Sequence, residues 1–538
     1  MKNLKNIIFW AGIFITILTY IFVRPLSNLD EIWNFNIARC ISNGLVPYKD
    51  ISMVATPLLS FITAIFLKIF GTEMFITRIL AAILAILNLI LVYRICKKLE
   101  ISKTITSILI LIITFILRDY FCLDYNFFVL AIGLAIILLE IRNVKNEKST
   151  IATQIFIGIL GGLSFCTKQS IGLLICFIIV INQLFFIKNK PDIKKLLKPI
   201  LFRVIGIIIP IIAFIIYLLC NNAFMEFLDY CIFGIKTFSN NIAYTSLVQS
   251  KDRLIKILSI FIPIILIASV IINIVTKCLK KENKTFYLLN IYCLPIFAIV
   301  YPIADNIHFL IGIIPALILL TYSIMWIVKR YIKLPAKYIL EFLEITSMIG
   351  LILFTIYVEF KNLETLGDLS KYTTLNNFKY IHVSQSLNDS IQEIDNYINS
   401  SDKKVYILDA CAAVYMIPID RYNKNYDMFN KGNLGSGGEG AQIENIKNED
   451  AKYLIMSDEN NRNWQTPESV VAYIKENLNK IGTIGEYDIY ENKITNEESL
   501  NTETPQSSTT ENTTIENSAP QAPENEETQS TIPQDNAQ

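Results

Sequence analysis

Apolar runs of membrane length recur along the first two thirds of the chain, and short polar segments separate them. A helix needs about 17–25 apolar residues to cross the hydrocarbon core of a bilayer. On this basis the pattern predicts eleven spans, near residues 7–23, 79–94, 104–118, 126–141, 151–166, 170–188, 200–219, 254–276, 285–302, 307–328 and 338–357.

One apolar run does not fit this series of spans. Pro57–Phe70 is short and contains Lys68, and its insertion as a span would reverse the side on which every later basic loop lies. We therefore expect it to form a helix that lies along the outer membrane surface. The first outer loop then extends from about Arg24 to Arg78.

The pattern changes after about residue 358. Residues 372–495 alternate strand-like runs ("KKVYILD", "AKYLIMS", "YDIYEN") with amphipathic helical stretches, which predicts a small α/β domain. Beyond about Ile494 the chain is rich in Asn, Glu, Thr, Ser, Gln and Pro, and such a segment buries too little apolar surface to fold. We therefore predict a polytopic α-helical membrane protein in three parts: a transmembrane domain (1–357), an extracytoplasmic α/β domain (358–495) and a disordered polar tail (496–538).

The composition agrees with a membrane protein. Of the 538 residues, 53% are hydrophobic, and the mean hydropathy of +0.45 is too high for a soluble protein with one or two ordinary cores. The 48 Lys and Arg residues nearly balance the 47 Asp and Glu residues, but the basic residues gather in every second loop. The basic loops contain Arg94, Lys97, Lys98 and Lys103; Arg142, Lys145 and Lys148; Lys188, Lys190, Lys194, Lys195 and Lys198; Lys277, Lys280, Lys281 and Lys284; and Lys329, Arg330, Lys333 and Lys337.

This alternation predicts the orientation of the chain. Lys and Arg accumulate in the cytoplasmic loops of membrane proteins. We therefore expect a multi-pass cell-membrane protein whose N-terminus is cytoplasmic and whose C-terminal domain is extracytoplasmic. Since membrane-length segments separate the basic clusters along the chain, nothing in the pattern suggests nucleic-acid binding, and we expect no nucleic acid as a partner.

Ionisable residues recur at the outer ends of the predicted spans, where loops from distant parts of the chain face one compartment. An acid at a helix end is often a solvated cap, and a Lys there often extends its ammonium group to the interface. Lys168 differs, because it is a cation on the side that is poor in Lys, and ionisable residues at membrane depth are costly to retain. Asp119 and Asp305 are interpreted as surface charges. The candidate site residues are Asp30, Glu31, Arg78, Asp124, Lys168 and His308.

Several of these residues lie in short motifs whose order resembles a known superfamily. "LDYN" spans residues 123–126 and "GGLSFCTKQS" spans residues 161–170. The first outer loop contains, in order, Asp30, Glu31, Ala38, Gly44, Pro47, Tyr48, Asp50, Pro57, Phe70, Gly71 and Arg78. Together these motifs resemble the GT-C glycosyltransferases, and within them the group of protein mannosyltransferases and lipid A aminoarabinose transferases.

The sequence departs from that group at one position. Members of the aminoarabinose branch have a Lys before the proline that opens the surface helix, whereas Thr56 precedes Pro57 here. A phosphate ligand of that branch is therefore missing or is supplied from elsewhere in the chain.

The resemblance implies a GT-C-like fold and a hexosyl- or pentosyltransferase whose donor is a polyprenyl-phosphate sugar and whose acceptor is a glycan, lipid or protein. Asp30 would be the base that takes the acceptor proton. Lys168, Arg78 and His308 would hold the donor phosphate. Glu31 and Asp124 would orient the acceptor or bind a divalent cation, Mg or Mn, which prefers oxygen ligands.

Two other functions fit parts of the pattern. A transporter or flippase for a lipid-linked sugar would bind the same lipid without chemistry, but transporters commonly show inverted repeats, and no clear internal repeat is present here. A catalytically inactive membrane scaffold, acting through its external domain, is the second alternative.

Overall fold

The computed structural model describes residues 2–146, 150–185, 193–279, 283–331, 334–458 and 465–492. The chain divides into two compact units, residues 1–493 and 494–538, and the description below concerns the first. The predicted tail (496–538) lies outside the described residues, and so do six of the predicted loop cations: Lys148, Lys188, Lys190, Lys280, Lys281 and Lys333.

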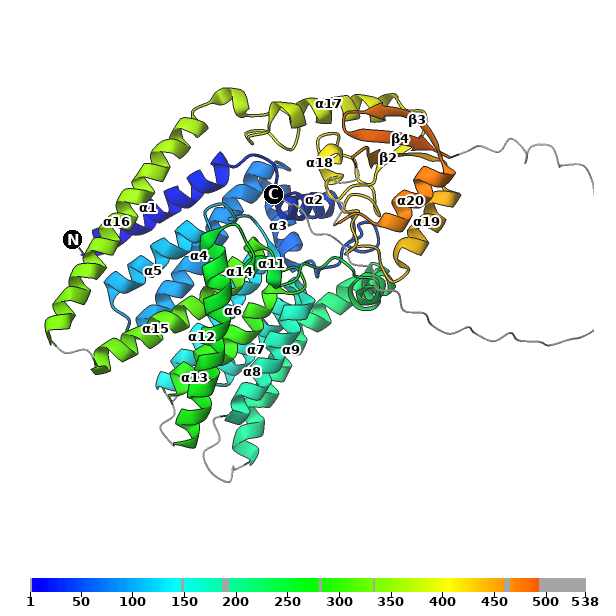
Figure 1. Cartoon of the computed structure of the whole chain (residues 1–538). Helices are drawn as coiled ribbons and strands as arrows, with labels where there is room; N and C mark the ends of the chain where they lie inside the picture. The colour runs from blue at the N-terminus through cyan, green and yellow to red at the C-terminus, as the bar shows by residue number, and fades with distance from the viewer. Residues whose placement is uncertain are drawn as a thin grey trace, which may run out of the picture. The chain divides into compact units, whose positions relative to one another are not determined.

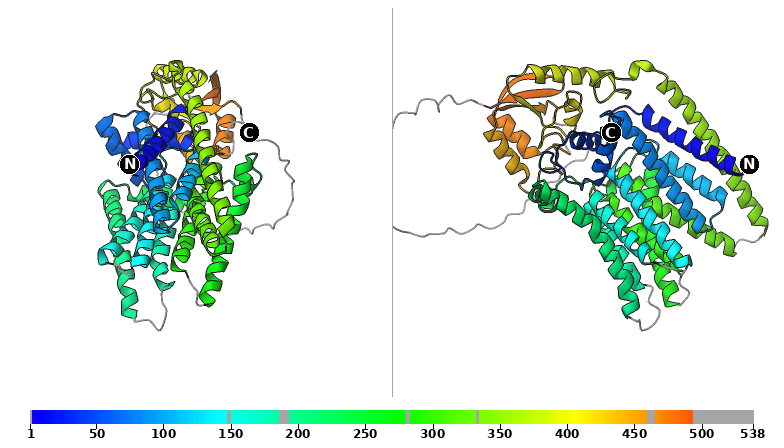
Figure 2. Two further views of the ribbon diagram at one scale, coloured as in Figure 1. Left: turned by 90° about the vertical axis from the view of Figure 1, so that its left-hand side faces the viewer. Right: turned by 180° about the vertical axis from the view of Figure 1, so that it is seen from behind.

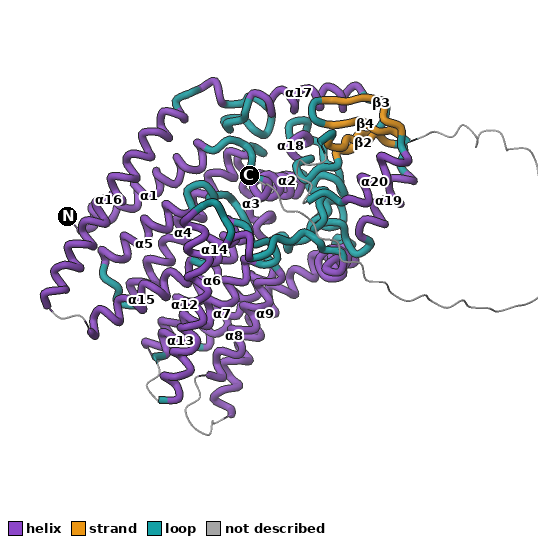
Figure 3. The backbone as a smooth tube through the Cα atoms, viewed as in Figure 1, coloured by secondary structure: helices purple, strands orange, loops and turns teal. Residues whose placement is uncertain are grey.

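Helices dominate the described part of the chain, as Figure 3 shows. Among the described residues, six helices are long and apolar enough to cross a membrane, or seven if a pair bent by 43° counts as one span. The six are α1 (Lys2–Val23), α4 (Met74–Lys98), α6 (Tyr125–Asn146), α9 (Ile193–Cys220), α12 (Arg253–Cys278) and α16 (Leu334–Leu366), and the bent pair is α14 (Asn306–Gly312) with α15 (Ile314–Tyr331).

Shorter apolar helices occupy the remaining predicted spans: α5 (Lys103–Ile116), α7 (Ile151–Thr167), α8 (Gln169–Phe185) and α13 (Lys284–Phe297). The prediction of a multi-pass membrane protein is therefore confirmed. The number of eleven spans stays a prediction, because these four helices have only 14 to 17 residues.

Two helices approach each other closely in this bundle. A Cβ atom added at Gly158 in α7 would lie 2.2 Å from the carbonyl oxygen of Arg203, and one added at Gly206 in α9 would lie 2.2 Å from that of Ile155. Small residues at such positions let membrane helices pack backbone to backbone. This contact fixes α7, whose C-terminal end leads directly into Lys168.

A buried polar network joins the helices from inside the bundle. The Arg203 guanidinium donates to both carboxylate oxygens of Glu140 in α6, at 2.7 and 3.0 Å. Its Nε donates to Gln154 of α7 at 2.5 Å, and the Tyr292 hydroxyl of α13 donates to Glu140 at 3.0 Å. Buried charges are retained only when paired in this way, so the network links four helices at defined positions.

Short helices and loops cover one end of the bundle, which is called the site end below. Helix α2 (Leu29–Ser42) packs against α3 (Leu58–Phe70), and both lie beside the sheet-containing segment in Figures 1 and 2. The end of α12 and the start of α13 lie at the opposite end of the bundle (Figure 1). The remaining short elements are α10 (Phe224–Phe227), η1 (Leu228–Ile232), η2 (Phe233–Lys236), α11 (Thr245–Val248), η3 (Ala298–Val300) and η4 (Leu369–Lys371).

The C-terminal part of the described chain contains a four-stranded sheet with the order β1-β2-β4-β3. Strand β1 (Lys404–Ile407) pairs parallel with β2 (Ala451–Met456), while β4 (Tyr487–Glu491) pairs antiparallel with both β2 and β3 (Asn479–Ile484). Helices α17 (Gln385–Ser400), α18 (Ala413–Met416), α19 (Gly438–Asn448) and α20 (Glu468–Asn477) accompany the sheet. β1, β2 and β4 lie in the three segments that the sequence pattern favours as strands.

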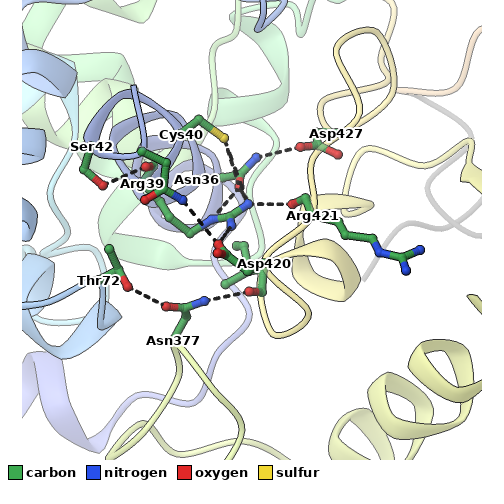
Figure 4. A network of polar contacts seen from close by, with 11 residues as sticks. Asn36, Arg39, Cys40, Ser42, Thr72, Asn377, Asp420, Arg421 and Asp427 are labelled. Carbon is green, nitrogen blue, oxygen red and sulfur yellow. Dashed lines mark hydrogen bonds and ion pairs between the residues drawn. The ribbon is translucent and has the colours of Figure 1, made fainter. Parts of the chain in front are cut away.

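This C-terminal segment docks on α2 through the contacts drawn in Figure 4. Arg39, only 1% exposed, donates to the Asp420 carboxylate at 2.5 Å and to the Arg421 carbonyl at 2.7 Å. Asn36 donates to Asp427 at 3.0 Å. Apolar side chains of α2 share one hydrophobic cluster with those of the sheet and α18. The segment therefore holds the helix on which Asp30 lies.

Candidate active site

The first turn of α2 places the predicted acid pair. The Asn28 side chain caps the helix by accepting the backbone N–H of Glu31 at 3.0 Å, so Asp30 and Glu31 lie in the first turn. Acidic residues are favoured there because the N-terminal end of a helix carries a partial positive charge. Consecutive residues on a helix point in different directions, and the two carboxylates have different surroundings.

Glu31 turns into the protein and pairs with Arg78 of α4. Arg78 Nε lies 2.9 Å from Oε1 of Glu31, and Arg78 Nη2 lies 3.1 Å from Oε2. The third guanidinium nitrogen donates to the Arg24 carbonyl at 2.9 Å, and both paired side chains are almost fully buried. The pair thus uses both carboxylate oxygens and all three guanidinium nitrogens within the protein.

Asp30 faces a pocket instead. No described residue forms a hydrogen bond or ion pair with its carboxylate, although its backbone carbonyl accepts from Asn34 at 2.7 Å. The pocket has a volume of about 470 Å³ and separates α2 from the loops before α12 and α14. Its described lining consists of Asn28, Leu29, Asp30, Trp33, Tyr120, Asn240, Ile242, Ser246, Leu247, Ile303, Ala304, Asp305, Asn306, Ile307, His308 and Gln465.

Lys168 occupies the single position between α7 and α8. Its ammonium group donates to Asn126 Oδ1 at 2.7 Å and lies 5.1 Å from the centre of the Tyr125 ring. Asp124, which is fully buried, accepts the backbone N–H of Asn126 at 2.6 Å through one oxygen, while its other oxygen has no hydrogen-bond partner among the described residues. The "LDYN" and "CTKQS" motifs therefore meet.

His308 belongs to α14 and is oriented by the residue that caps this helix. Asp305 Oδ1 accepts the backbone N–H of His308 at 2.9 Å and lies 2.7 Å from its ring Nδ1. Asp305 was interpreted from the sequence as a surface charge. The structure instead pairs it with His308, and one third of its side chain is exposed.

These side chains form one electrostatic cluster. Removal from solvent, followed by the charge of Asp124, raises the pKa of Asp30 to about 7, while His308 and Lys168 oppose the rise. Removal from solvent also raises the pKa of Asp124 and lowers the pKa of Lys168 to about 8. Asp30, Asp124, Lys168 and His308 thus interact with one another, whereas Glu31 and Arg78 interact with each other beside this cluster.

The described residues do not provide a set of metal ligands. No group of three or more described His, Cys, Asp or Glu side chains is arranged to hold a metal ion. Of the two predicted ligands, Glu31 already uses both oxygens on Arg78. The residues present therefore do not fit the predicted Mg or Mn ion, and no step below depends on one.

The structure also shows residues near the site that the sequence pattern did not single out. Asn126 connects Lys168 to Asp124, and Trp33 donates its indole N–H to the Ala410 carbonyl at 2.7 Å while lining the pocket. Thr56, which the sequence pattern did single out, donates to the Phe165 carbonyl of α7 at 2.7 Å. "LDYN" contains Asn126 two residues after Asp124, and this spacing was the available signal in the sequence.

A larger groove of about 680 Å³ lies between α1, α5 and α16, with a mainly apolar lining. It shares no described lining residue with the pocket beside Asp30. The electrostatic cluster of Asp30, Asp124, Lys168 and His308 is therefore confined to the site end of the bundle.

The chain is similar to a known protein family and to solved structures. Residues 54–218 match the family model of dolichyl-phosphate-mannose-protein mannosyltransferases, a range that includes Arg78, Asp124 and Lys168. No curated protein sequence matches the chain significantly.

Two solved structures of ArnT from Cupriavidus metallidurans are similar to this chain over almost the whole of both proteins. The apo structure matches with a TM-score of 0.57 and 11% identity, over 91% of this chain and 98% of ArnT. The structure bound to undecaprenyl phosphate matches with a TM-score of 0.56 and 10% identity, over 92% and 99%. An oligosaccharyltransferase from Archaeoglobus fulgidus, in complex with Zn and sulfate, matches at a TM-score of only 0.45 with 11% identity, over 89% and 73%, and nothing is inferred from it.

At these identities the likeness to ArnT shows a shared fold. The shared fold and the family match together confirm the resemblance of this chain to the membrane glycosyltransferases of the GT-C superfamily.

Proposed function

We propose that the protein transfers a hexose or pentose from a polyprenyl-phosphate donor to an acceptor hydroxyl on a glycan, lipid or protein at the extracytoplasmic face of the membrane. One observation carries this proposal. The Asp30 carboxylate, which has no partner among the described residues, borders a pocket, and the charges of Asp124, His308 and Lys168, from distant parts of the chain, act on it. The family match and the ArnT structure that contains undecaprenyl phosphate support the lipid-linked donor.

Asp30 acts as the base in this scheme. The acceptor oxygen attacks the anomeric carbon of the donor sugar, and its proton passes to Asp30. The bond between that carbon and the phosphate oxygen breaks, so the glycoside and the polyprenyl phosphate are the products. A carboxylate whose pKa is raised to about 7 is a stronger base than an ordinary one, and about half of it is ionised near neutral pH.

Lys168 stabilises the departing phosphate. One of its three N–H bonds is directed to Asn126, which leaves donors for an anionic ligand. A cation in a site of low dielectric stabilises developing charge more strongly than one in water does. His308, held by Asp305, adds a second donor group on the pocket side, and Asp124 fixes the Asn126 backbone that positions Lys168.

Glu31 and Arg78 receive different roles from those that the resemblance implies. Both side chains are buried, and their polar atoms are engaged by each other and by the Arg24 carbonyl, so we exclude them from binding an acceptor, a metal or a phosphate. We assign this pair to positioning: it joins the first turn of α2 to α4 and thereby orients Asp30.

The experiment is incubation of the purified chain with a panel of polyprenyl-phosphate sugars and a membrane extract as acceptor source, followed by mass spectrometry. We expect wild-type protein to release polyprenyl phosphate and form a glycoside from at least one donor. Asp30→Asn should lower turnover about 10²–10⁴-fold, the range typical of a lost general base, while donor binding persists. Lys168→Met should weaken donor binding itself.

Asp119→Asn is the matched control, because Asp119 is an exposed acid at the same end of the bundle and does not line the pocket. If labelled lipid crosses the membrane while no glycoside forms, the protein is a transporter and the proposal is wrong. Turnover that is unchanged in Asp30→Asn would contradict the assignment of the base.

A further inference from the structure

Two buried amide side chains in the pocket each have an oxygen without a hydrogen-bond partner among the described residues. Asn240 and Gln465 are 5% and 4% exposed, and both line the pocket beside Asp30. Asn240 Oδ1 and Gln465 Oε1 form no hydrogen bond with any described residue. A buried acceptor without a partner is unfavourable, and each such group in a native structure calls for an explanation, such as a missing ligand.

The two amides come from distant segments that the backbone holds together. Ser239 N–H donates to the Lys431 carbonyl at 3.3 Å, and Lys431 N–H donates to the Gln465 carbonyl at 2.9 Å. On the other side of Asn240, Ile242 forms an isolated bridge with Ile303, next to Asp305 and His308. The unpaired oxygens therefore belong to a fixed wall of the pocket.

The chemistry of the pocket selects the kind of ligand. Its described lining contains two further amide side chains, Asn28 and Asn306, and the indole of Trp33. It contains the carboxylates of Asp30 and Asp305, while no Lys or Arg is present among the described lining residues. The one imidazole among the described lining residues, His308, is already paired with Asp305, so an anionic sugar would meet the Asp30 carboxylate with no Lys or Arg of the described lining to offset the repulsion. Hydroxyl groups would provide the donors that the amide oxygens lack.

We propose that Asn240 and Gln465 are specificity-determining residues that accept hydrogen bonds from the hydroxyl groups of a sugar ring without negative charge. This inference deepens the proposed function and rests on it for the reaction that the bound sugar undergoes. In this arrangement the phosphate of the donor lies at the edge of the pocket, toward His308, which lines it, and Lys168, which does not. The sugar belongs either to the donor or to the acceptor.

Direct binding tests the inference without turnover. The full chain in detergent is titrated with the methyl glycosides of mannose, glucose, galactose and arabinose and with methyl glucuronide, and binding is measured by saturation-transfer NMR. We expect at least one uncharged glycoside to bind and the glucuronide to bind at least tenfold more weakly. Asn240→Leu and Gln465→Met should each weaken the uncharged glycoside about three- to tenfold, the value of one neutral hydrogen bond.

Two matched control variants make the same kind of amide-to-apolar substitution at residues outside the pocket. Asn241→Leu changes the exposed neighbour of Asn240, and Gln442→Met changes a buried glutamine in α19 whose Oε1 also lacks a described partner. Neither control should alter binding. If a pocket variant does not fold, monodeoxy glycosides remove the hydroxyl from the ligand instead, and at least one should bind wild-type protein about three- to tenfold more weakly.

The inference would be overturned if both pocket variants bound the uncharged glycoside with wild-type affinity. It would also be overturned if wild-type protein bound the glucuronide, or every deoxy glycoside, as tightly as the uncharged parent glycoside. Kinetics then separates the two sources of the sugar: a raised KM for the polyprenyl-phosphate sugar identifies the donor, and a raised KM for the acceptor identifies the acceptor. The protein could bind a glycoside through Asn240 and Gln465 and yet turn over no donor. This result would contradict the proposed function, but it would still support the proposed sugar site.

Discussion

At the scale of single residues, the site depends on how one carboxylate differs from its neighbour. Asp30 and Glu31 are adjacent, yet Glu31 is neutralised by a buried guanidinium while Asp30 faces a pocket with no described partner. A paired carboxylate is a weak base, because its partner stabilises the ionised form. The surroundings therefore favour Asp30 over Glu31 as the proposed base, although both residues are carboxylic acids.

The pKa values of two residues predict a bell-shaped dependence of kcat/KM on pH. Asp30 is active as the anion, so activity should rise as the pH increases through about 7, the raised pKa of its carboxyl. Lys168 is active as the cation, so activity should fall as the pH increases through about 8, the lowered pKa of its ammonium group. Because the groups interact, the two limbs report apparent values of the cluster.

Lys168→Arg is the control for the alkaline limb. A guanidinium stays protonated throughout this range, so the decrease at high pH should disappear while the acid limb remains. An unchanged alkaline limb in this variant would show that another group causes it.

At the scale of elements, buried ion pairs hold the helices that carry the site. Glu31 and Arg78 join α2 to α4, and Glu140 and Arg203 join α6 to α9. A buried pair adds little net stability relative to apolar residues, but loss of one partner leaves a buried charge without compensation. Such pairs therefore define the register of neighbouring helices more than they stabilise the fold.

We expect Arg78→Met to lower the free energy of unfolding by about 3–5 kcal/mol, because Glu31 would remain buried and unpaired. Unfolding in detergent, followed by circular dichroism, measures this change. Arg118→Met is the control: Arg118 and Asp119 form a pair with side chains 37% and 63% exposed, and its loss should change stability by less than about 1 kcal/mol. Equal effects of the two substitutions would contradict the structural role of Arg78.

Some of these elements could be predicted from the sequence and others could not, and the reasons are physical. Long apolar runs and the motifs around Asp30, Asp124 and Lys168 were recognisable, because membrane insertion and charge at span ends leave strong local patterns. Glu140 and Arg203 were missed, because each lies near or within a predicted span. The reason for a charge at each position is the ion pair that they form between two helices, and the sequence does not show that pair. Asn240 and Gln465 carry no charge and lie in loops, so no local pattern distinguishes them from other amides.

At the scale of the whole molecule, the sheet-containing C-terminal segment forms part of the pocket beside Asp30. It contributes Gln465 to the pocket, and its residues accept hydrogen bonds from Trp33, Asn36 and Arg39 of α2. The separate α/β domain predicted for residues 358–495 stays a prediction, since the described chain to residue 493 forms one compact unit.

Two truncated chains test this dependence. A chain that ends at residue 366 should lose activity and unfold at a markedly lower temperature, because Arg39 would lose its partners and the apolar side chains around Ile32 and Phe35 would lose their cover. A chain that ends at residue 493 should match the full-length protein in thermal denaturation and in donor turnover. Full activity of the shorter chain would show that α2 holds Asp30 in place unaided.

The absence of any loop around Lys168 has a consequence for the catalytic cycle. One residue separates the last turn of α7 from the first turn of α8, and α7 is locked against α9 by glycines. The backbone therefore fixes the position of Lys168, and its ammonium group can move only by rotation about the bonds of its own side chain. In the proposed reaction, the polyprenyl-phosphate donor would therefore have to move its phosphate group to Lys168 and away again, because Lys168 cannot move to meet it.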